Sequence, residues 1–298
     1  MRKKILFIFN PHSGKGSVKN KLFDIIDAFV KYDYEVIVHP TQYPKDGYHR
    51  VKTTAKEVDL IVCCGGDGTL DEVVSGLMQA EVHVPIGYIP AGSTNDFANS
   101  LEIPKDMVTA AHNIMDGKRY SFDVGTFNDE TFVYVAAFGM FTDVSYQTNQ
   151  ELKNMLGHLA YVMEGAKKIL DIKKYRMKVE ANGNVYEGDY IYGMITNSYS
   201  VGGFKNLTGK NVEMDDGLFE VTLIKMPKNP LELNEIITAL ATGYDHTDMI
   251  DAFKTDRLTV HSVGNIPVAW TLDGEFGGNQ VDVEIRNKKQ ALDIIINT

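Results

Sequence analysis

Short, continuous apolar runs alternate with segments of helical periodicity along the first 125 residues of the chain. The apolar runs have the length of strands and cover residues 5–9, 34–39, 59–64 and 85–90. Between them, hydrophobic residues recur at spacings of three and four, which predicts helices over 22–30, 48–57, 68–78, 96–101 and 107–115. Continuous apolar strands that alternate with helices are typical of a mostly parallel sheet covered on both faces.

The pattern changes after about Asp123, where strand-like segments follow one another with only two helical stretches between them, 149–172 and 230–243. Turn signals such as NGN, DDG and DGE separate the segments. Strands in succession predict a separate antiparallel β domain, built as a sandwich. The strand-like segments are FVYVAAF, YRMKVEAN, VYEGDYIYGMITN, GLFEVTLIKM, RLTVHSV and VDVEIRN.

These two patterns predict an α/β protein of two domains, for which a length of 298 residues is suitable. The first is a mostly parallel α/β domain over residues 1–124. The second is an antiparallel β-sandwich domain over 125–288. Because the last residues, about 289–298, are again apolar, we expect them to return to the sheet of the first domain.

The composition is that of a globular protein, with 44% hydrophobic and 23% charged residues. No apolar run approaches the roughly 18 to 20 residues that span a bilayer. The N-terminal run ILFIF is shorter than the core of a signal peptide, so we expect a cytoplasmic protein. The two cysteines, Cys63 and Cys64, are adjacent and cannot form an unstrained disulfide, and their apolar strand predicts buried thiols.

Charge is unevenly distributed along the chain. The net charge of -10 argues against a nucleic-acid-binding protein. Residues 151–178, however, contain seven Lys or Arg against three acidic residues, interspersed with apolar side chains. Such a segment can contact an anionic membrane surface, or it can be a solvated helix face that packs on its own domain.

The segment GGDGT at 65–69 joins a predicted strand directly to a predicted helix. Backbone N–H groups at a helix N-terminus attract anions, and Gly65, Gly66 and Gly68 would let the backbone approach a phosphate closely. The alternative is a tight strand-to-helix turn in which Asp67 caps the helix. Three glycines in four positions exceed what such a turn needs, which favours the phosphate site.

Two further polar, glycine-containing loops follow predicted strands, NPHSGKG at 10–16 and PAGSTNDFA at 90–98. Each alone is weak evidence, because these residues also form ordinary turns. Loops that follow parallel strands meet at the carboxyl edge of the sheet, where such folds bind ligands. We therefore expect all three loops to converge on one site.

Acidic residues accompany these loops. Asp67, Asp96 and Asp123 would lie at the same edge of the sheet and could hold a hydrated Mg²⁺ beside phosphates. Asp96 could instead cap the helix that follows it. Much later, WTLDGEFGG at 270–278 is a strand that enters a turn with the signature Asp273-Gly274, after which Glu275 could be simply a solvated turn residue.

Together, GGDGTLDEVVSG, PAGSTNDFA, NPHSG, VGGF (201–204), EMDDGLF (213–219) and TLDGE resemble the catalytic-domain family of diacylglycerol kinases, and in particular its bacterial soluble members. The resemblance covers nearly the whole chain, with the motifs in family order. GGDGT alone is shared with NAD kinases and 6-phosphofructokinases, and the implied nucleotide domain is similar to theirs.

The resemblance implies a role for particular residues. Glu275 would be the general base, and Asp67 would act in catalysis. Asp67, Asp96 and Asp123 would hold a catalytic Mg²⁺ through water, and Glu213, Asp216 and Leu218 a structural Mg²⁺. ATP would bind at Asn10, Pro11, His12, Ser13, Gly14, Thr41, Gly65, Gly66, Asp67, Gly68, Thr69, Glu72 and Thr94.

The resulting hypothesis is an ATP- and Mg²⁺-dependent lipid kinase of phospholipid biosynthesis, with diacylglycerol as the favoured acceptor and phosphatidate as the product. Monoacylglycerol, a sphingoid base or a polyprenol would also fit as the acceptor. The lipid would be presented at the inner face of a membrane, where the protein associates transiently with anionic headgroups through Lys15, Lys19, Lys167 and Lys168. Exposed β edges could also form a homodimer. The alternatives are an NAD kinase, whose later GSTAY-like segment we do not find, and a non-catalytic nucleotide- or lipid-binding protein.

Overall fold

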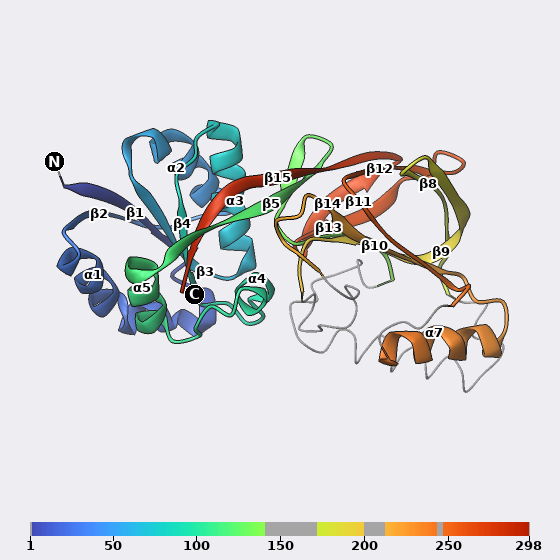
Figure 1. Ribbon diagram of the computed structural model, residues 1–298, viewed down its shortest axis with the longest axis horizontal. Coiled ribbons are helices and arrows are strands. Elements are labelled where there is room, and N and C mark those ends of the chain that lie inside the picture. Colours follow the sequence, from blue (N-terminus) through green and yellow to red (C-terminus); the bar gives the residue numbers. More distant parts are fainter. Residues whose placement is uncertain (1, 141–171, 200–211, 243–246, 298) are drawn as a thin grey trace. The chain divides into compact units, whose positions relative to one another are not determined.

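The computed structural model describes residues 2–140, 172–199, 212–242 and 247–297. The chain divides into two compact units, of which the first consists of Met1–Asp123 with Gln290–Thr298 and the second of Val124–Lys289. Figure 1 shows both units, and the chain passes between them in strands β5 (Lys118–Phe127) and β15 (Asp282–Ile296). The VGGF motif and almost all of the predicted helical stretch 149–172 lie outside the described residues.

The first unit contains a parallel sheet in the order β4-β3-β1-β2. Its strands are β1 (Lys3–Phe9), β2 (Tyr34–Pro40), β3 (Leu60–Gly65) and β4 (Ile86–Pro90). The last part of β15 pairs in parallel with β4, through Ile294 and Ile86. The predicted parallel sheet is therefore confirmed, and the C-terminal residues pair with it at β4.

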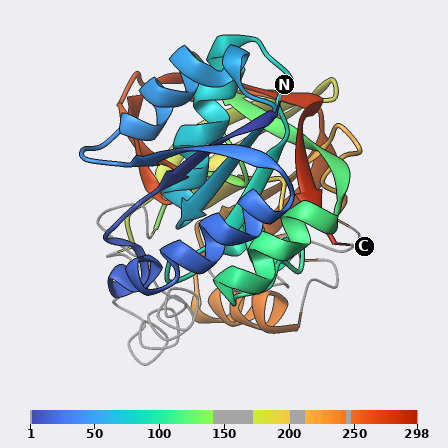
Figure 2. The same ribbon diagram turned by 90° about the vertical axis from the view of Figure 1, so that its left-hand side faces the viewer.

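Helices cover both faces of this sheet, as Figure 2 shows. Helices α1 (Leu22–Lys31) and α5 (Met107–Asp116) pack together on one face, and α2 (Asp46–Thr54) and α3 (Asp67–Ala80) pack together on the other. Helix α1 buries Ile25, Ala28 and Phe29, whereas Val30 is half exposed. The shorter elements are η1 (Ser13–Asn20), η2 (Ala55–Glu57) and α4 (Asp96–Ser100).

The second unit is the β-sandwich domain, and its strand pairs are antiparallel. Along one path the order is β14-β13-β7-β9-β8-β12-β15, and β10 pairs with both β9 and β11. The buried core of this unit contains Trp270, Phe138 and Phe127. The ring centroids of Phe138 and Phe127 lie 4.8 and 5.0 Å from that of Trp270. The elements are β6 (Glu130–Phe132), β7 (Val135–Gly139), β8 (Tyr175–Ala181), β9 (Asn184–Thr196), β10 (Phe219–Lys225), α7 (Pro230–Thr242), β11 (Ile250–Thr255), β12 (Arg257–Ser262), β13 (Val268–Leu272) and β14 (Glu275–Gln280).

Two segments of this unit differ from the sequence prediction. FVYVAAF was predicted as one strand, but it divides into β6 and β7 because the N–H groups of residues 133–135 donate to the Asp273 carboxylate. Glu275, which could have been a turn residue, instead begins β14, because pairing with β13 across a two-residue turn outweighs the low strand propensity of the glycines that follow.

Candidate active site

The loops that follow β1, β3 and β4 meet at the carboxyl edge of the parallel sheet. The N–H of Asn10 donates to the carbonyl of Cys64 over 3.0 Å, and the N–H of Ala91 donates to the carbonyl of Gly65 over 2.7 Å. These bonds fix the start of each loop beside its neighbour. The predicted convergence of three loops is confirmed.

Close backbone contacts between the loops explain two of the glycines. A Cβ atom on Gly92 would lie 2.5 Å from the Cα of Gly66, so a side chain there would separate the second and third loops. A Cβ atom on Gly14, which has a φ of +55°, would lie 2.4 Å from the carbonyl oxygen of Ala91. Glycine is therefore required for the loops to approach one another, as well as for any approach to a ligand.

The first loop is more regular than the turn that the sequence predicts. Asn10 accepts the N–H of His12 with its side chain, over 2.9 Å, and the N–H of Ser13 with its carbonyl, over 3.2 Å. The chain then forms the 3-10 helix η1 from Ser13, which contains Lys15 and ends near the exposed Lys19. Pro11 and Gly14 complete this loop.

Asp67 is the first residue of helix α3, and Gly66 precedes it in an extended conformation. The Asp67 side chain does not cap its own helix. Instead its Oδ2 accepts the N–H of Asp96 over 3.2 Å, at the start of α4. Its Oδ1 is buried and has no hydrogen-bond partner in the described part of the chain. Burial and the neighbouring charge of Asp96 raise the pKa of Asp67 to about 6.

The other residues of the GGDGT segment support this turn. Thr69 is buried, and its side chain lies so close to Gly65 that a Cβ atom there would be 2.4 Å from the Thr69 Oγ1. The N–H of Thr69 donates to the carbonyl of Gly66 over 3.0 Å. Gly68 lies between Gly66 and Thr69, in the first turn of α3. These contacts fix the turn that joins β3 to α3.

The third loop is held by Asn95, which sequence reasoning missed. Asn95 is in the left-handed conformation, with φ 53°, and its amide forms reciprocal 2.9 Å hydrogen bonds with the N–H and carbonyl of Gly92. The Tyr88 hydroxyl donates to the carbonyl of Gly65 over 3.3 Å and so links strand β4 to the second loop. Thr94 accepts the Asn99 amide with its carbonyl. Asparagine before a helix start, which tolerates the left-handed region, is the signal that could have identified Asn95.

The three acids are not equivalent in the structure. Asp67 and Asp96 are neighbours, and Asp96 is the buried first residue of α4 rather than the residue that caps it. Asp123 is buried in β5, and its Oδ1 accepts the N–H of Gln290 over 2.7 Å. Across residues 2–140, 172–199, 212–242 and 247–297, no three His, Cys, Asp or Glu side chains converge as direct metal ligands. The donor set that fits a cation is the unpartnered Oδ1 of Asp67 beside Asp96, with water as the remaining ligands.

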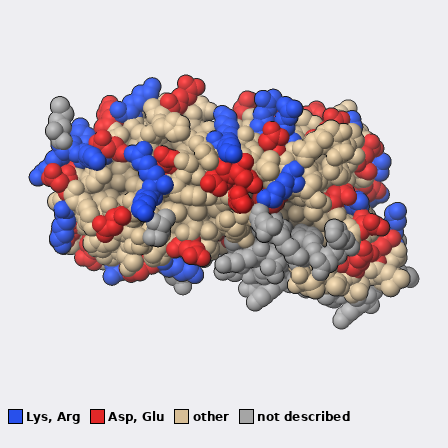
Figure 3. Space-filling model, in the orientation of Figure 1, with Lys and Arg blue, Asp and Glu red and all other residues tan. Residues whose placement is uncertain are grey.

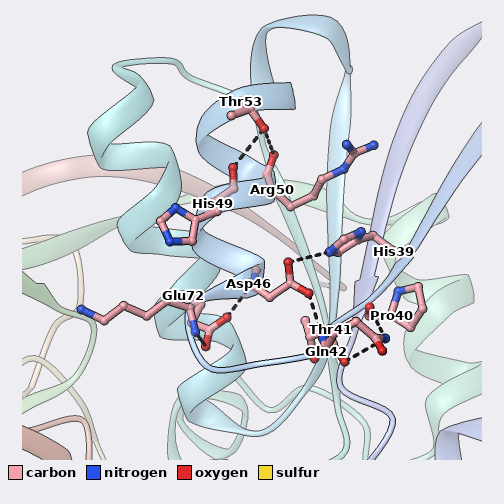
Figure 4. Close-up of polar contacts among 11 residues, drawn as sticks. His39, Pro40, Thr41, Gln42, Asp46, His49, Arg50, Thr53 and Glu72 are labelled. Atoms are coloured by element: carbon pink, nitrogen blue, oxygen red, sulfur yellow. Dashed lines mark hydrogen bonds and ion pairs between the residues drawn. The ribbon is translucent and has the colours of Figure 1, made fainter.

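Thr41 and Glu72 both belong to the surroundings of the turn after β2, drawn in Figure 4. The N–H of Thr41 donates to the carbonyl of Phe9 over 2.9 Å, directly beside Asn10. The Glu72 carboxylate accepts the N–H groups of Lys45 and Gly47, over 2.7 and 2.9 Å. Thr41 therefore lies at the same sheet edge as the three loops, and Glu72 contacts the turn that carries it.

In the second unit, Glu275 is the exposed first residue of β14 and pairs with Leu272 across the hairpin. The turn residues Asp273 and Gly274 have φ values of 50° and 85°, as the sequence signature predicts. The buried Asp273 carboxylate also accepts three consecutive backbone N–H groups, those of residues 133–135, over 2.5–2.9 Å. The carboxylate of Glu275 forms no hydrogen bond or ion pair with the described residues.

The DDG segment forms a tight turn before β10. Asp216 Oδ1 accepts the N–H of Leu218 over 2.8 Å, and its Oδ2 lies 3.4 Å from the Nζ atom of Lys254. The same Nζ atom is 2.9 Å from the Oε1 of Glu220, whose pKa is raised to about 7 by burial. Glu213 is exposed. The oxygen-rich turn suits a hard cation, but Lys254 already supplies positive charge to it.

The basic residues proposed for membrane contact are only partly described. Lys19 is exposed, only the backbone of Lys15 is described, and Lys167 and Lys168 lie outside the described residues. On the face drawn in Figure 3, Lys and Arg are interspersed with Asp and Glu over the first unit. None of the described helices has both the length and the apolar character that crossing a membrane requires.

Two family profiles match the chain. Residues 4–127 match the diacylglycerol kinase catalytic domain, and residues 135–296 match the YegS C-terminal NAD kinase beta sandwich-like domain. A solved structure of a Bacillus anthracis diacylglycerol kinase has the same fold, with a TM-score of 0.76 at 22% identity. The match covers 99% of this chain and 97% of the chain in that structure.

Two relatives carry the same name. The diacylglycerol kinase of Bacillus subtilis is 33% identical over 279 residues, which cover 93% of this chain and 91% of the relative. That of Staphylococcus aureus is 31% identical over 297 residues, which cover 99% of this chain and 92% of the relative.

Proposed function

The chain belongs to the diacylglycerol kinase family, and from this premise we propose that it transfers the γ-phosphoryl group of ATP to the hydroxyl of diacylglycerol. The product would be phosphatidate. The observation that carries the proposal is Asp67, a carboxylate with one unpartnered, buried oxygen at the meeting point of three glycine-containing loops. Such a group is costly to the fold unless a ligand uses it.

The nucleotide would bind along the carboxyl edge of the parallel sheet. The backbone of Asn10 to Gly14, the start of α3 and the loop through Thr94 supply N–H groups for the phosphates, and Thr41 lies beside Asn10. This use of backbone donors requires neither the lysine nor the following Ser or Thr of a P-loop. The close approach of the loops at Gly14, Gly66 and Gly92 supports a preformed site.

Asp67, Asp96 and Asp123 would hold the Mg²⁺ ion through water, and of these Asp123 already has its Oδ1 bonded to the N–H of Gln290. When bound, the ion would offset charge on the transferring phosphoryl group. Asp67 supplies the oxygen that has no internal partner. A second Mg²⁺ would bind only weakly at Asp216 and the carbonyls of Glu213 and Leu218, because Lys254 already supplies positive charge to this turn.

Glu275 would accept the proton of the attacking lipid hydroxyl. The lipid oxygen forms a bond to the γ-phosphorus while the bond to the β-phosphate oxygen breaks and ADP leaves. An exposed carboxylate suffices, because proton loss can follow phosphoryl transfer in a loose transition state. Asp273 would hold the hairpin that presents Glu275, since its carboxylate binds three backbone N–H groups.

We also propose that the lipid is reached at a membrane surface. The exposed Lys19, the nearby Lys15, and Lys167 and Lys168 would contact anionic headgroups. A homodimer is a further proposal, supported by β11, which pairs only with β10 among the described strands.

The proposal is tested by incubating the purified chain with radiolabelled ATP, Mg²⁺ and mixed micelles that contain diacylglycerol. We expect labelled phosphatidate, and we expect Glu275→Gln and Asp67→Ala each to lower the rate at least about 10³-fold while circular dichroism shows a folded protein. Wild-type turnover in both variants would refute the mechanism. Conversion of NAD to NADP would instead identify an NAD kinase, and ATP binding without turnover on any lipid would identify a non-catalytic protein.

A further inference from the structure

The turn after β2, residues 40–47, is held in place by two carboxylates, that of Glu72 on helix α3 and that of Asp46 within the turn itself (Figure 4). This turn carries Thr41, whose N–H donates to the carbonyl of Phe9, and Thr41 therefore lies beside the loop that begins at Asn10. The turn is therefore a fourth segment at the sheet edge where the three glycine-containing loops meet. It contains no glycine before Gly47, so its conformation depends on other contacts.

The first carboxylate belongs to Glu72, in the second turn of α3. Its Oε1 accepts the N–H of Lys45 over 2.7 Å, and its Oε2 accepts the N–H of Gly47 over 2.9 Å. Lys45 is in the left-handed conformation, with φ 67°, immediately before helix α2 begins. Glu72 thus occupies the N-terminus of α2, where the backbone N–H groups and the helix dipole favour a negative charge. Both of its oxygens are engaged by the protein.

Close packing of α2 against α3 makes this contact possible. A Cβ atom on Gly47 would lie 2.7 Å from the Glu72 Oε2. One turn beyond Glu72, a Cβ atom on Gly76 would lie 2.8 Å from the Cβ of Val51 and 2.9 Å from the carbonyl of Tyr48. Glycines on each helix therefore bring the two backbones together, and Glu72 reaches the turn without moving away from α3.

The second carboxylate is that of Asp46, which is buried. Its Oδ2 accepts the N–H of Gln42 over 2.8 Å, and its Oδ1 lies 3.2 Å from the His39 Nε2 at the end of β2. The Gln42 amide in turn donates to the carbonyl of Pro40 over 2.9 Å. Asp46 therefore closes the turn from within, while Glu72 fixes it to α3.

We infer that Glu72 and Asp46 are positioning residues that together set the 40–47 turn as one wall of the nucleotide site. Glu72 acts on the nucleotide through the backbone of this turn, because both of its oxygens are already bonded. Glu72 and Asp67 both belong to helix α3, so the 40–47 turn and the end of the GGDGT loop are attached to one rigid element. This inference rests on the proposed function.

The principal test replaces Glu72 by glutamine, whose amide nitrogen cannot accept an N–H. We expect the KM for ATP to rise about 10-fold, with kcat within about twofold and the KM for lipid unchanged, as for a lost binding contribution. Glu81→Gln, on the exposed C-terminal end of the same helix, is the matched charge control and should leave all three constants unchanged. Thermal unfolding of each variant identifies any loss of folded protein.

Two further variants distinguish positioning from direct contact. Gly47→Ala keeps the charge of Glu72 but forces its carboxylate away from the turn. Asp46→Asn weakens the hydrogen bond to the N–H of Gln42 inside the turn. Both should raise the KM for ATP as Glu72→Gln does. If only Glu72→Gln has an effect, the inference of positioning is wrong.

Amide hydrogen exchange and nucleotide binding make the test independent of lipid turnover. Exchange at Lys45 and Gly47 should accelerate at least about 10-fold in Glu72→Gln, and the Kd of a non-hydrolysable ATP analogue should rise by the same factor as the KM. Faster exchange with an unchanged Kd would overturn the inference and leave the proposed function standing. Absence of wild-type lipid phosphorylation would refute the proposed function, while the exchange and Kd measurements would still decide the inference.

Discussion

Asp67 and Asp273 are both acids of glycine-containing motifs, one in each unit, and the structure gives them opposite environments. The Asp273 carboxylate accepts three backbone N–H groups, and both of its oxygens are satisfied. Asp67 has one oxygen bonded to the N–H of Asp96, and its other oxygen is buried without a partner among the described residues. Hydrogen-bond saturation therefore separates an acid that holds the fold from one that is available to a ligand.

The same distinction has an energetic side. A satisfied buried carboxylate stabilises the loops that it joins, whereas a buried carboxylate with an unused oxygen and an acidic neighbour destabilises the folded state when it is ionised. The pKa of Asp67, raised to about 6 by burial and by Asp96, is consistent with such a destabilised charge. A functional group that the fold does not stabilise is expected where a ligand completes the site.

The largest expected effect comes from Asp67→Asn. We expect lipid phosphorylation to fall about 10³-fold, because the acid that would hold the metal is neutralised. The free energy of unfolding at pH 8, measured by urea denaturation without nucleotide or Mg²⁺, should not fall. A large loss of stability together with the loss of activity would place Asp67 with the acids that hold the fold, and the comparison with Asp273 would fail.

The reverse is expected for Asp273→Ala. Three buried N–H groups would lose their acceptor, so the free energy of unfolding should fall by about 3 kcal/mol or more. Activity should fall as well, because the Glu275 hairpin loses its attachment to residues 133–135. Asp129→Ala, in the exposed turn between β5 and β6, is the control and should change the stability by less than about 0.5 kcal/mol. If Asp273→Ala and Asp129→Ala lower the free energy of unfolding equally, Asp273 is not an acid that holds the fold.

The pH dependence of stability sharpens the contrast. Because the pKa of Asp67 is about 6 in the folded state and about 3.8 when unfolded, stability from this group is fully present below about pH 4 and is lost as pH rises through 6. The total loss is about 3 kcal/mol, of which about half falls between pH 5 and pH 8. Urea denaturation across this range, without Mg²⁺, should show the decline in the wild type and a correspondingly smaller decline in Asp67→Asn.

Much of this arrangement follows from local pattern. The four apolar runs became β1 to β4, the helices between them formed where the periodicity predicted them, and Ile294 pairs with Ile86 as the apolar C-terminus indicated. The convergence of the loops also followed from the sequence, because the carboxyl ends of parallel strands lie along the same edge of the sheet. Asp273-Gly274 is likewise the turn that its signature predicts.

The remaining features depend on partners that are distant in sequence. Nothing in FVYVAAF indicates a break, since the acceptor that captures its backbone is Asp273, about 140 residues later. Similarly, Glu72 matches a nucleotide-binding position by resemblance, but the hydrogen bonds to Lys45 and Gly47 become visible only when α2 packs on α3. IDAFKT was not predicted as a strand, and it forms β11 by pairing with β10.

The least change is expected at Asp216, in the second unit. Its hydrogen bonding is intermediate between that of Asp67, which has an unpartnered oxygen among the described residues, and that of Asp273, whose oxygens are both bonded. The Asp216 Oδ1 accepts the N–H of Leu218, and its Oδ2 faces Lys254, which also pairs with the buried Glu220. In the wild type Lys254 supplies the positive charge of this turn, so we expect Mg²⁺ to leave the thermal stability of this unit nearly unchanged.

Lys254→Met should lower the free energy of unfolding at neutral pH by about 1–2 kcal/mol. The loss is limited because the raised pKa of Glu220, about 7, lets this acid take up a proton instead of remaining as an unpaired charge. Addition of millimolar Mg²⁺ should recover part of the loss in the variant, since the oxygen-rich turn then lacks its internal cation. Lys178→Met removes a lysine that pairs with the exposed Glu180 and serves as the control, with little change and no dependence on Mg²⁺. If the wild type gains as much stability from Mg²⁺ as Lys254→Met does, the turn binds a metal despite Lys254, and Asp216 belongs with Asp67 rather than with Asp273.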